Sequence, residues 1–352
     1  MRKKTKVIRI GDRFIGGAHD ILIQSMCNTK TADADATIAQ ILRLEEAGCE
    51  IVRVSVPDAD SAKAIQQIKK AIHIPLVADI HFDYRLAMES IENGIDKVRI
   101  NPGNIGSERG IRELIACVKD RGIPIRIGVN SGSVNKDILR KYGKVCAEAL
   151  RDSALEHVHI LEKYGFEDIV VSVKSSSVQM TYETNTLLSQ ALEYPLHLGV
   201  TECGANLQGE VKASIGIGSL LINGIGDTIR VSITGDPVTE IPVAKEILSS
   251  CGIRQFGVNI IACPTCARCQ MDLKAVVDEV SELCKGMDEK ISIAIMGCEV
   301  NGPGEAKEAD IGIAGAPNYA LLFSRGKIIS RHPYHEIKEA LLRQIELLRK
   351  EP

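Results

Sequence analysis

The sequence predicts an α/β protein, a (β/α)8 barrel followed by a small α+β domain. Three observations support this prediction. Short β-branched runs alternate with amphipathic helical patterns up to residue 233. In the last hundred residues this regular alternation of strands and helices ends, and a Cys-rich motif occurs there. Strands that alternate with helices indicate parallel βαβ units. Eight such units match a (β/α)8 barrel, which typically takes about 250 residues.

The eight predicted barrel strands are apolar runs that end in polar or Gly residues. In chain order they cover residues 21–26, 51–56, 75–80, 97–101, 124–129, 168–173, 195–200 and 227–233, with helical patterns such as 36–47, 61–71 and 107–120 between them. A doubly wound open sheet is the alternative, and it usually carries a Gly-rich first turn. The nearest match, Gly216-Ile-Gly218-Ser-Leu-Leu, comes late and lacks the third Gly, so the barrel is favoured.

The second domain is predicted from the change of pattern after residue 238. We expect a barrel domain at 1–238 and a second domain at 239–352, with 239–252 as a connector that carries one helix. The second domain begins with a strand at 257–261, a helix at 273–285 and a strand at 291–296. A Gly/Pro loop, short strands near Ile311 and Ala320 and an amphipathic helix near 335–350 follow.

The composition excludes several classes of function. The net charge is −3, aromatic residues make up 3% of the chain and Trp is absent, so neither a basic field nor stacking platforms for nucleic acid are present. No apolar run reaches the roughly 18–20 residues that span a bilayer, and the basic start lacks an apolar signal-peptide core. We therefore expect a cytoplasmic protein that binds neither membrane nor nucleic acid. Eleven Cys residues, an odd number, then indicate buried thiols or a few metal ligands.

Charged side chains recur on one face of the predicted strands. Side chains alternate across a strand, so each of these charges lies opposite apolar neighbours that must face the helices. The polar face therefore points into the barrel, where Val, Ile and Leu are usual. Five cations take part, with one clear opposing charge, Asp79: they are Arg53, Arg99, Arg126, Lys174 and Arg230.

Unpaired buried cations are costly, so this stripe predicts an anionic ligand. Arg side chains match phosphate oxygens, and a diphosphate is the natural candidate. Asn130 and His81 share the inward face with these cations. The alternative is that the charges are solvated at the rim or pair with carboxylates from loops.

The strongest local motif is Cys263-Pro-Thr-Cys266-Ala-Arg-Cys269, with Met296-Gly-Cys298 downstream. Both segments follow predicted strands, so they could converge at one metal centre. Cys263, Cys266 and Cys298 with a fourth ligand could hold a [4Fe–4S] cluster. Alternatively Cys269 is the third ligand, the site is structural zinc, or Cys-Pro-Thr-Cys is a redox dithiol.

Several motifs together resemble the 4-hydroxy-3-methylbut-2-enyl diphosphate synthase family. They are Ile23-Gln-Ser-Met-Cys-Asn-Thr, Val77-Ala-Asp-Ile-His-Phe-Asp, Arg99-Ile-Asn-Pro-Gly-Asn, Ile127-Gly-Val-Asn-Ser-Gly, Gly199-Val-Thr-Glu and Met296-Gly-Cys298 with Asn301-Gly-Pro-Gly-Glu305. The resemblance runs almost end to end. It implies a TIM barrel followed by an iron–sulfur domain similar to that of sulfite reductases. It also implies a homodimer in which the cluster domain of one subunit covers the barrel of the other.

The resemblance also implies the chemistry, a reductive dehydration and ring opening of 2-C-methyl-D-erythritol 2,4-cyclodiphosphate in isoprenoid precursor synthesis. Flavodoxin or ferredoxin would donate the electrons. Cys263, Cys266, Cys298 and Glu305 match the family's ligands of a [4Fe–4S] cluster. The diphosphate ligands would be Arg53, Arg99, Arg126, Lys174 and Asn130.

The remaining candidates act close to the reacting atoms. Glu202 is the expected proton donor and Asn301 lies beside the cluster by the same resemblance, while Asp79 and His81 would orient substrate hydroxyls. Ala267 and Cys269 depart from the family's pattern, and Cys269 leaves a spare thiol. The competing hypothesis is a non-catalytic, anion-binding barrel with a structural zinc site.

Overall fold

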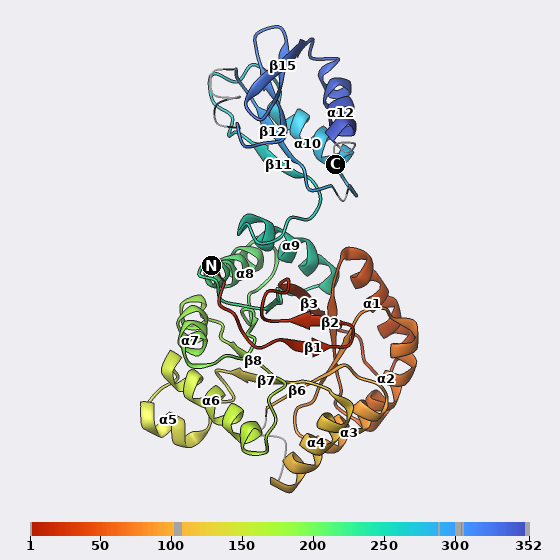
Figure 1. Cartoon of the computed structure of the whole chain (residues 1–352), viewed down its shortest axis with the longest axis vertical. Coiled ribbons are helices and arrows are strands. Elements are labelled where there is room, and N and C mark those ends of the chain that lie inside the picture. Colours follow the sequence, from red (N-terminus) through yellow and green to blue (C-terminus); the bar gives the residue numbers. More distant parts are fainter. Residues whose placement is uncertain (1, 102–107, 288, 300–303, 305, 349–352) are drawn as a thin grey trace. The chain divides into compact units, whose positions relative to one another are not determined.

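The computed structural model describes residues 2–101, 108–287, 289–299, 304 and 306–348. The chain forms two compact units, Met1–Ile253 and Arg254–Pro352 (Figure 1). None of the helices in the described ranges combines the length and the apolar character needed to cross a bilayer.

Eight parallel strands form the barrel of the first unit, which confirms the predicted fold class. β3 to β8 pair in sequence order, β10 pairs with both β3 and β9, and a bridge from Val171 to Leu196 joins β8 to the chain just before β9. The strands are β3 (Leu22–Met26), β4 (Ile51–Ser55), β5 (Leu76–Asp79), β6 (Lys97–Ile100), β7 (Ile125–Asn130), β8 (Ile169–Lys174), β9 (His197–Leu198) and β10 (Thr228–Ile229).

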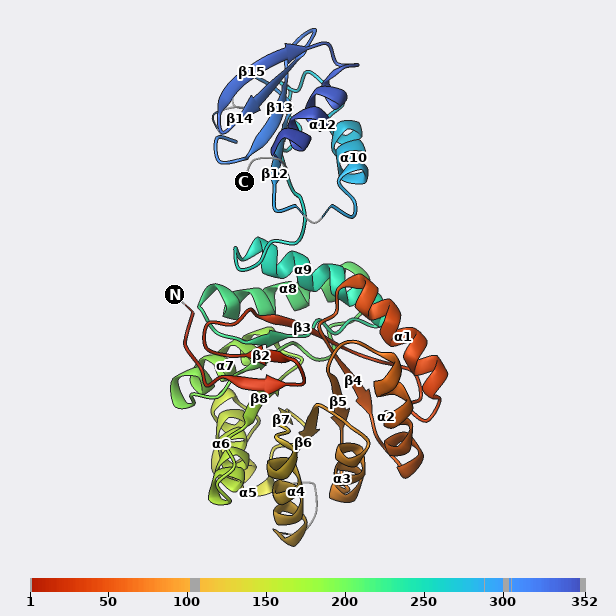
Figure 2. The ribbon, with the colours of Figure 1, turned by 45° about the vertical axis from the view of Figure 1, so that its right-hand side comes forward.

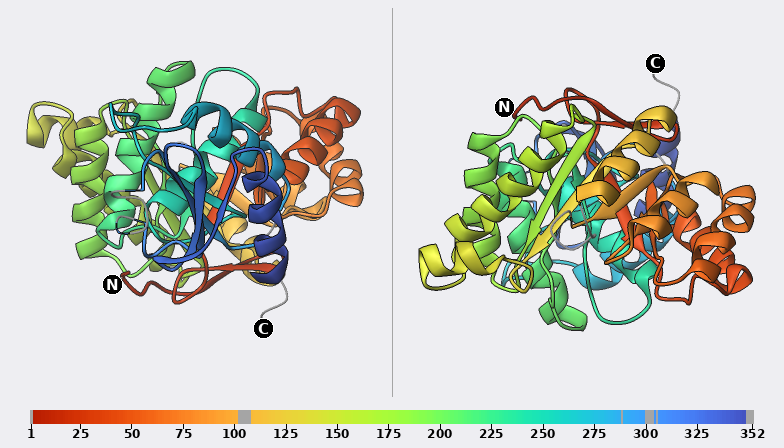
Figure 3. Two further views of the ribbon diagram at one scale, coloured as in Figure 1. Left: turned by 90° about the horizontal axis from the view of Figure 1, so that it is seen from above. Right: turned by 90° about the horizontal axis from the view of Figure 1, so that it is seen from below.

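Helices lie on the outside of these strands (Figures 1 and 2), and the view from below in Figure 3 shows the same arrangement. Asp33, Asp58 and Asp83 cap three of them, because each carboxylate accepts a backbone N–H in the first turn. The helices are α1 (Ala34–Ala47), α2 (Ala59–Ala71), α3 (Tyr84–Glu92), α4 (Glu108–Arg121), α5 (Lys136–Tyr142), α6 (Ala147–Lys163), α7 (Val178–Ala191) and α8 (Asn206–Ile222).

An antiparallel hairpin, which sequence analysis did not predict, precedes the barrel. It consists of β1 (Ile8–Ile10) and β2 (Arg13–Ile15), and Gly11 takes a positive φ of 60° in its turn. Its three Ile side chains pack against residues near the start of barrel strands: the cluster contains Ile8, Ile10, Ile15, Leu22, Ile51, Val77 and Val170. The hairpin therefore packs against the amino end of the barrel, at the opposite end from the strands' carboxyl termini.

A short 3-10 turn (Pro237–Thr239) and helix α9 (Glu240–Ser250) end the first unit. Sequence analysis placed 239–252 as a connector belonging to the second domain. In the structure α9 packs against α1, α8 and β3, and the first compact unit runs to Ile253.

In its described residues, the second unit is a five-stranded mixed sheet with two helices. Its strands lie in sequence order, the first three parallel and the last two antiparallel, and the final strand was not predicted. Ile293 and Ile295 face α10 and α12, while Ala294 and Met296 pack on the opposite side against Ala306 and Ala309. The elements are β11 (Asn259–Ala262), α10 (Leu273–Leu283), β12 (Ser292–Met296), β13 (Ile311–Gly315), β14 (Ala320–Ser324), β15 (Lys327–His332) and α12 (Ile337–Leu348).

Candidate active site

A cavity of about 320 Å³ lies in the barrel at the carboxyl ends of its strands. Active sites of (β/α)8 barrels occupy this end. The five predicted cations all line it, as do Asp79, His81 and Asn130. The full lining is Met26, Arg53, Asp79, His81, Arg99, Arg126, Gly128, Val129, Asn130, Ser172, Lys174, Thr201, Arg230 and Ser232.

Asp79 lies between two of the arginines. Its Oδ1 is 2.9 Å from Arg99 Nη1, and its Oδ2 is 3.7 Å from Arg53 Nε. The carboxylate is only 3% exposed. Burial opposes its ionisation, but the Arg53 and Arg99 charges outweigh that effect and hold the pKa of Asp79 below its ordinary value. One carboxylate therefore compensates two guanidinium groups.

Glu240 is the partner of a third arginine, and sequence analysis missed it. It is the first residue of α9, is 3% exposed, and its Oε2 lies 3.5 Å from Arg230 Nε. Ser25 Oγ and the Ile233 N–H also donate to this carboxylate. Burial raises the pKa of Glu240, although the Arg230 charge and these hydrogen bonds oppose the change. The residue was overlooked because its segment reads as a connector.

The other two predicted cations have no such compensation. Among the described residues, no carboxylate lies within ion-pair distance of Arg126 or Lys174, which are 1% and 9% exposed. Arg126 Nε and Nη1 are buried without a hydrogen-bond partner in the described chain. Arg53 directs Nε and Nη2 at the Met26 thioether, 3.0 and 2.7 Å away, although sulfur is a weak acceptor. The cavity thus contains more donors than acceptors, as an anion-binding site requires.

Two glycines make room for the cations. A Cβ on Gly128 would lie 2.3 Å from Arg99 Nε, and one on Gly199 would lie 2.5 Å from Lys174 Nζ and 2.7 Å from the Arg230 carbonyl oxygen. A side chain at either position would displace the cation, and one at Gly199 would also clash with the backbone carbonyl of Arg230. The two glycines therefore let long cationic side chains lie flat against neighbouring strands.

The predicted polar residues His81, Asn130 and Glu202 are all exposed, and two of them line the cavity. His81 lines the cavity and its Nε2 is 3.5 Å from Arg99 Nη1, while Asn130 Oδ1 accepts the Gly132 N–H at 3.1 Å. Glu202 follows β9 at a positive φ of 54° and is exposed; it is not among the cavity-lining residues, but its neighbour Thr201 is.

A deeper polar layer lies on the same inward strand faces. Lys97, His197 and Gln24 are 0%, 0% and 1% exposed, and none of them lines the cavity. Sequence analysis passed over Lys97, although it precedes Arg99 by two residues and must share its face.

The predicted thiol segments of the second unit lie side by side. β11 and β12 are parallel neighbours, and Cys263 and Cys298 follow their carboxyl ends. The Gly297 N–H donates to Cys263 Sγ at 3.2 Å, and a Cβ on Gly297 would lie 2.6 Å from Cys269 Sγ. Cysteine thiolates are soft ligands that donate an electron pair to a metal, as an iron–sulfur cluster requires. Cys266 is exposed, while Asn301 and Glu305 lie outside the described residues.

The thiols differ in their environments. Hydrogen bonds from the Arg268 backbone and side chain lower the pKa of Cys266. Burial raises the pKa of Cys27 and Cys49 to about 12, as expected for thiols that only pack. Within the described ranges, no three His, Cys, Asp or Glu side chains surround a single point as they would around one ion.

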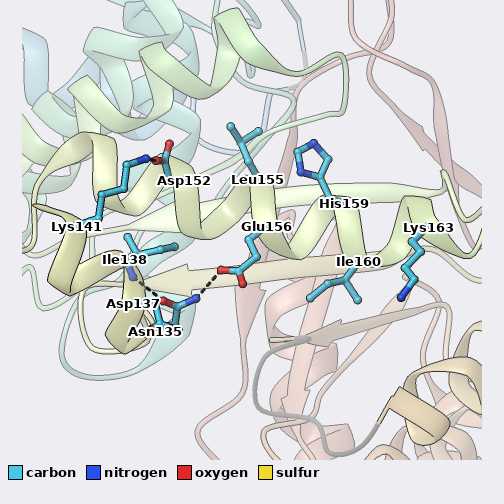
Figure 4. Close-up of a pocket in the computed structure, with 10 residues that line it drawn as sticks. All are labelled: Asn135, Asp137, Ile138, Lys141, Asp152, Leu155, Glu156, His159, Ile160 and Lys163. Carbon is cyan, nitrogen blue, oxygen red and sulfur yellow. Dashed lines mark hydrogen bonds and ion pairs between the residues drawn. The ribbon is translucent and has the colours of Figure 1, made fainter.

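A larger cavity of about 730 Å³ lies outside the barrel between α5 and α6 (Figure 4). Its charged groups pair locally: Lys141 Nζ is 2.8 Å from Asp152, and Asn135 donates to Glu156. Because no uncompensated charges converge there, the barrel cavity is the better candidate for chemistry.

Family models match both units of the chain. The GcpE TIM-barrel domain matches residues 5–245, and the GcpE protein C-terminal domain matches residues 259–347. A protein of Caldanaerobacter subterraneus is 54% identical over 351 residues, covering 100% of this chain and 99% of its own length. A protein of Ruminiclostridium cellulolyticum is 54% identical over 344 residues and covers 98% of each. Both are named 4-hydroxy-3-methylbut-2-en-1-yl diphosphate synthase (flavodoxin).

Solved structures at much lower identity show the fold alone. The chain is similar to dihydropteroate synthase of Stenotrophomonas maltophilia, with a TM-score of 0.51 and 10% identity over 71% of this chain and 100% of that one. It is also similar to N-acetylneuraminic acid synthetase of Leptospira borgpetersenii, with a TM-score of 0.50 and 11% identity over 81% of this chain and 100% of that one.

Proposed function

The chain belongs to the GcpE family, and from this premise we propose that it is a 4-hydroxy-3-methylbut-2-en-1-yl diphosphate synthase. It converts 2-C-methyl-D-erythritol 2,4-cyclodiphosphate into 4-hydroxy-3-methylbut-2-enyl diphosphate. Two electrons and two protons enter, the ring C–O bond to phosphate breaks, and the hydroxyl on the neighbouring carbon leaves as water. The alternative of a non-catalytic barrel with a structural zinc site is not favoured, because the curated relatives are named as the enzyme.

One observation carries the assignment of the substrate site: the cavity gathers five cations around one carboxylate, with further donors left over. We assign the diphosphate to Arg53, Arg99, Arg126, Lys174 and Arg230, with Asn130 at the rim. Fixed cations around a phosphate that becomes a leaving group stabilise the charge that develops on it.

The cofactor we propose is a [4Fe–4S] cluster held by Cys263, Cys266, Cys298 and Glu305. The adjacent parallel strands β11 and β12 support the first and third of these ligands. Bound there, the cluster would pass two electrons from the external donor to the substrate one at a time, and the carboxylate ligand would leave one iron open to substrate more readily than a fourth thiolate.

The protein groups around the reacting carbons then have separate tasks. We assign Glu202 as the proton donor, since it stands on the loop after β9 beside the cavity residue Thr201. Asp79 and His81 orient the substrate hydroxyls, and by the family resemblance we assign Asn301 a role beside the cluster. Asp79 is held ionised by Arg53 and Arg99, so it can accept a hydrogen bond but cannot donate one.

Flavodoxin is the electron donor that we propose, because the relatives carry it in their names; ferredoxin is the alternative. A cytoplasmic location accompanies this proposal, since free thiols persist in a reducing compartment.

We propose a homodimer, and helix α8 offers a surface for it. Leu207, Val211, Ile215 and Ile222 follow one another along this helix and are 71%, 47%, 55% and 74% exposed. Monomeric proteins seldom expose a large contiguous apolar patch, and a twofold axis would pair this one with itself. In sedimentation, Ile215→Lys should yield monomers, while Leu42→Lys on α1, also exposed, should leave the dimer intact. Dimers of Ile215→Lys would reject this surface.

The experiment that tests the function is an anaerobic assay. The purified protein should be brown, contain about four irons per chain, and convert the cyclodiphosphate when reduced flavodoxin is supplied. A colourless zinc protein that binds the cyclodiphosphate without converting it would instead support the non-catalytic alternative.

A further inference from the structure

Lys97 lies in the polar layer beneath the cavity and has an unusual environment for a lysine. It is fully buried, and its Nζ donates to Oε1 of Gln24, 3.3 Å away on β3, three strands from β6. The strand parity that directs Arg99 into the cavity directs Lys97 into the same interior, one layer deeper.

The charges around Lys97 are mostly positive. Arg53 and Arg126 both disfavour a charged amine at this position, while the adjacent Asp96 favours it. Asp96, however, is engaged by Lys69 Nζ at 2.6 Å and by the Leu76 N–H at 2.7 Å. Further inward polar groups are Asp79 on β5, Arg99 on β6 itself, Ser172 and Lys174 on β8, His197 on β9, and Thr228 on β10 with Arg230 directly after it.

The carboxylates inside the barrel are already committed. Asp79 pairs with Arg53 and Arg99, and Glu240 pairs with Arg230, so no carboxylate of the described interior is left for Lys97, Lys174 or Arg126. An arginine stays charged in proteins, but a buried lysine can lose its proton. Desolvation, followed by the Arg126 and Arg53 charges, lowers the pKa of Lys97 well below its ordinary value.

We propose that Lys97 is a positioning residue that takes up one proton when the diphosphate binds in the cavity above it. This inference rests on the proposed function. The incoming phosphates offset the positive field of Arg53 and Arg126, which adds to the effect of burial in disfavouring a charged amine. Because coupling between two sites is reciprocal, the proton on Lys97 in turn strengthens diphosphate binding.

His197 shares this layer but should not take up the proton. Its Nδ1 is 2.9 Å from Thr228 Oγ1, its Nε2 is buried without a partner in the described chain, and burial with the charges of Arg126 and Lys174 lowers its pKa. An imidazole has an ordinary pKa of about 6.5 and a lysine one of about 10.4, so relief of the same field favours a charged lysine over a charged imidazole near neutral pH.

Calorimetric titration at pH 7.5 in buffers of different ionisation enthalpy measures the uptake. Each phosphorus of the cyclodiphosphate carries a single, strongly acidic hydroxyl, so the ligand does not titrate near neutrality and any uptake belongs to the protein. Lys174 is also buried, with a pKa lowered well below its ordinary value, so it can take up a proton of its own. Lys97→Met should therefore bind about one proton per ligand fewer than the wild type, with affinity lower by roughly tenfold or more, the effect of a one-unit pKa change. His197→Gln and the exposed-site control Lys119→Met should keep the uptake.

The outcomes separate this inference from the proposed function. If the wild type does not bind the cyclodiphosphate, the function itself fails. Binding without proton uptake, or uptake that is undiminished in Lys97→Met, overturns the inference alone; uptake lost only in His197→Gln would transfer the role to that histidine. Should Lys97→Met fail to fold, Lys97→Gln, which keeps a polar group facing Gln24, replaces it in the same titration.

Discussion

Arg126 and Arg99 come from adjacent strands at the same height, yet their surroundings differ. Arg99 has Asp79 at 2.9 Å, whereas Arg126 is 1% exposed and leaves two buried donors without a partner in the described residues. A buried cation without a counter-charge costs folding stability and gains most from an anionic ligand. Replacement of Arg126 should therefore weaken ligand binding without lowering the stability of the ligand-free protein.

Arg126→Met should weaken binding of the cyclodiphosphate by about 2–5 kcal/mol, roughly 30- to 4,000-fold. The same change removes an uncompensated charge from the interior, so the melting temperature without ligand should not fall. Calorimetric titration and thermal unfolding measure the two effects. Arg140→Met on the exposed face of α5 is the control, and unchanged affinity in Arg126→Met would contradict the assigned phosphate site.

His157 on α6 predicts a pH dependence of stability. It is 4% exposed, and burial lowers its pKa from 6.5 to about 4. The imidazole is thus neutral in the folded protein and binds a proton more readily when unfolded. Stability is complete above pH 6.5 and falls as the pH drops toward 4, by about 2 kcal/mol at pH 5.

Urea unfolding at pH 7.5 and pH 5 tests this dependence in the wild type and in His157→Gln. The variant should lose less stability than the wild type between the two values. His73→Gln, at an exposed position on the surface, should behave as the wild type does. An equal loss in all three proteins would assign the acid sensitivity to other groups.

At the scale of elements, the ends of strands carry the chemistry. β11 and β12 are parallel neighbours, so the residues that follow them, Cys263 and Cys298, come to the same edge of the sheet. The loop between them also holds Cys269, whose Sγ packs against Gly297 and contacts the Met271 carbonyl oxygen at 3.2 Å. This packed position explains Cys269 without a metal.

Cys269→Ser should therefore keep its iron, while Cys263→Ser should lose most of it. Anaerobic iron and sulfide analysis of the two variants, purified in parallel, gives the comparison. If Cys263→Ser retained its iron and Cys269→Ser lost it, Cys269 would be the cluster ligand in place of Cys263. The matched control is Cys284→Ser, which replaces a buried thiol at the end of α10. This variant should contain as much iron as the wild type.

At the scale of the whole molecule, binding and redox chemistry belong to different compact units. All the cavity cations lie in Met1–Ile253, and all the proposed cluster ligands lie in Arg254–Pro352. The hairpin Ile8–Ile15 packs at the amino end of the barrel, so the first unit can maintain its cavity through its own contacts. Removal of the cluster should thus abolish turnover but leave the anion site formed.

Chelation of the iron tests this separation. The iron-free protein should bind the cyclodiphosphate with an affinity within about tenfold of the loaded protein, because the proposed phosphate contacts all lie in the barrel. A tenfold difference corresponds to about 1.4 kcal/mol of binding free energy, which we attribute to contacts of the substrate with the cluster. Calorimetry under anaerobic conditions gives both affinities. Complete loss of binding would mean that the cluster, and not the barrel cations, dominates recognition.

Sequence reasoning succeeded where a local rule decides the outcome. Arg53, Arg99, Arg126, Lys174 and Arg230 could be placed on inward faces because side chains alternate along a strand, and the (β/α)8 class followed from the order of the elements. Lys97 obeys the same rule and could have been found. Glu240 could not, because nothing local distinguishes a carboxylate that starts an outer helix from one that ends buried beside Arg230.

The amino-acid sequence by itself determined the strand order, the inward stripe of cations and the thiols at the ends of two strands, since each depends on neighbours a few residues away. Only the tertiary structure decided which cations are compensated. Barrel closure brings together groups such as Lys97 and Gln24, 73 positions apart in the chain, and sets how deeply each is buried. Charge compensation depends on these distances and on exclusion of water, and neither is encoded in a local pattern.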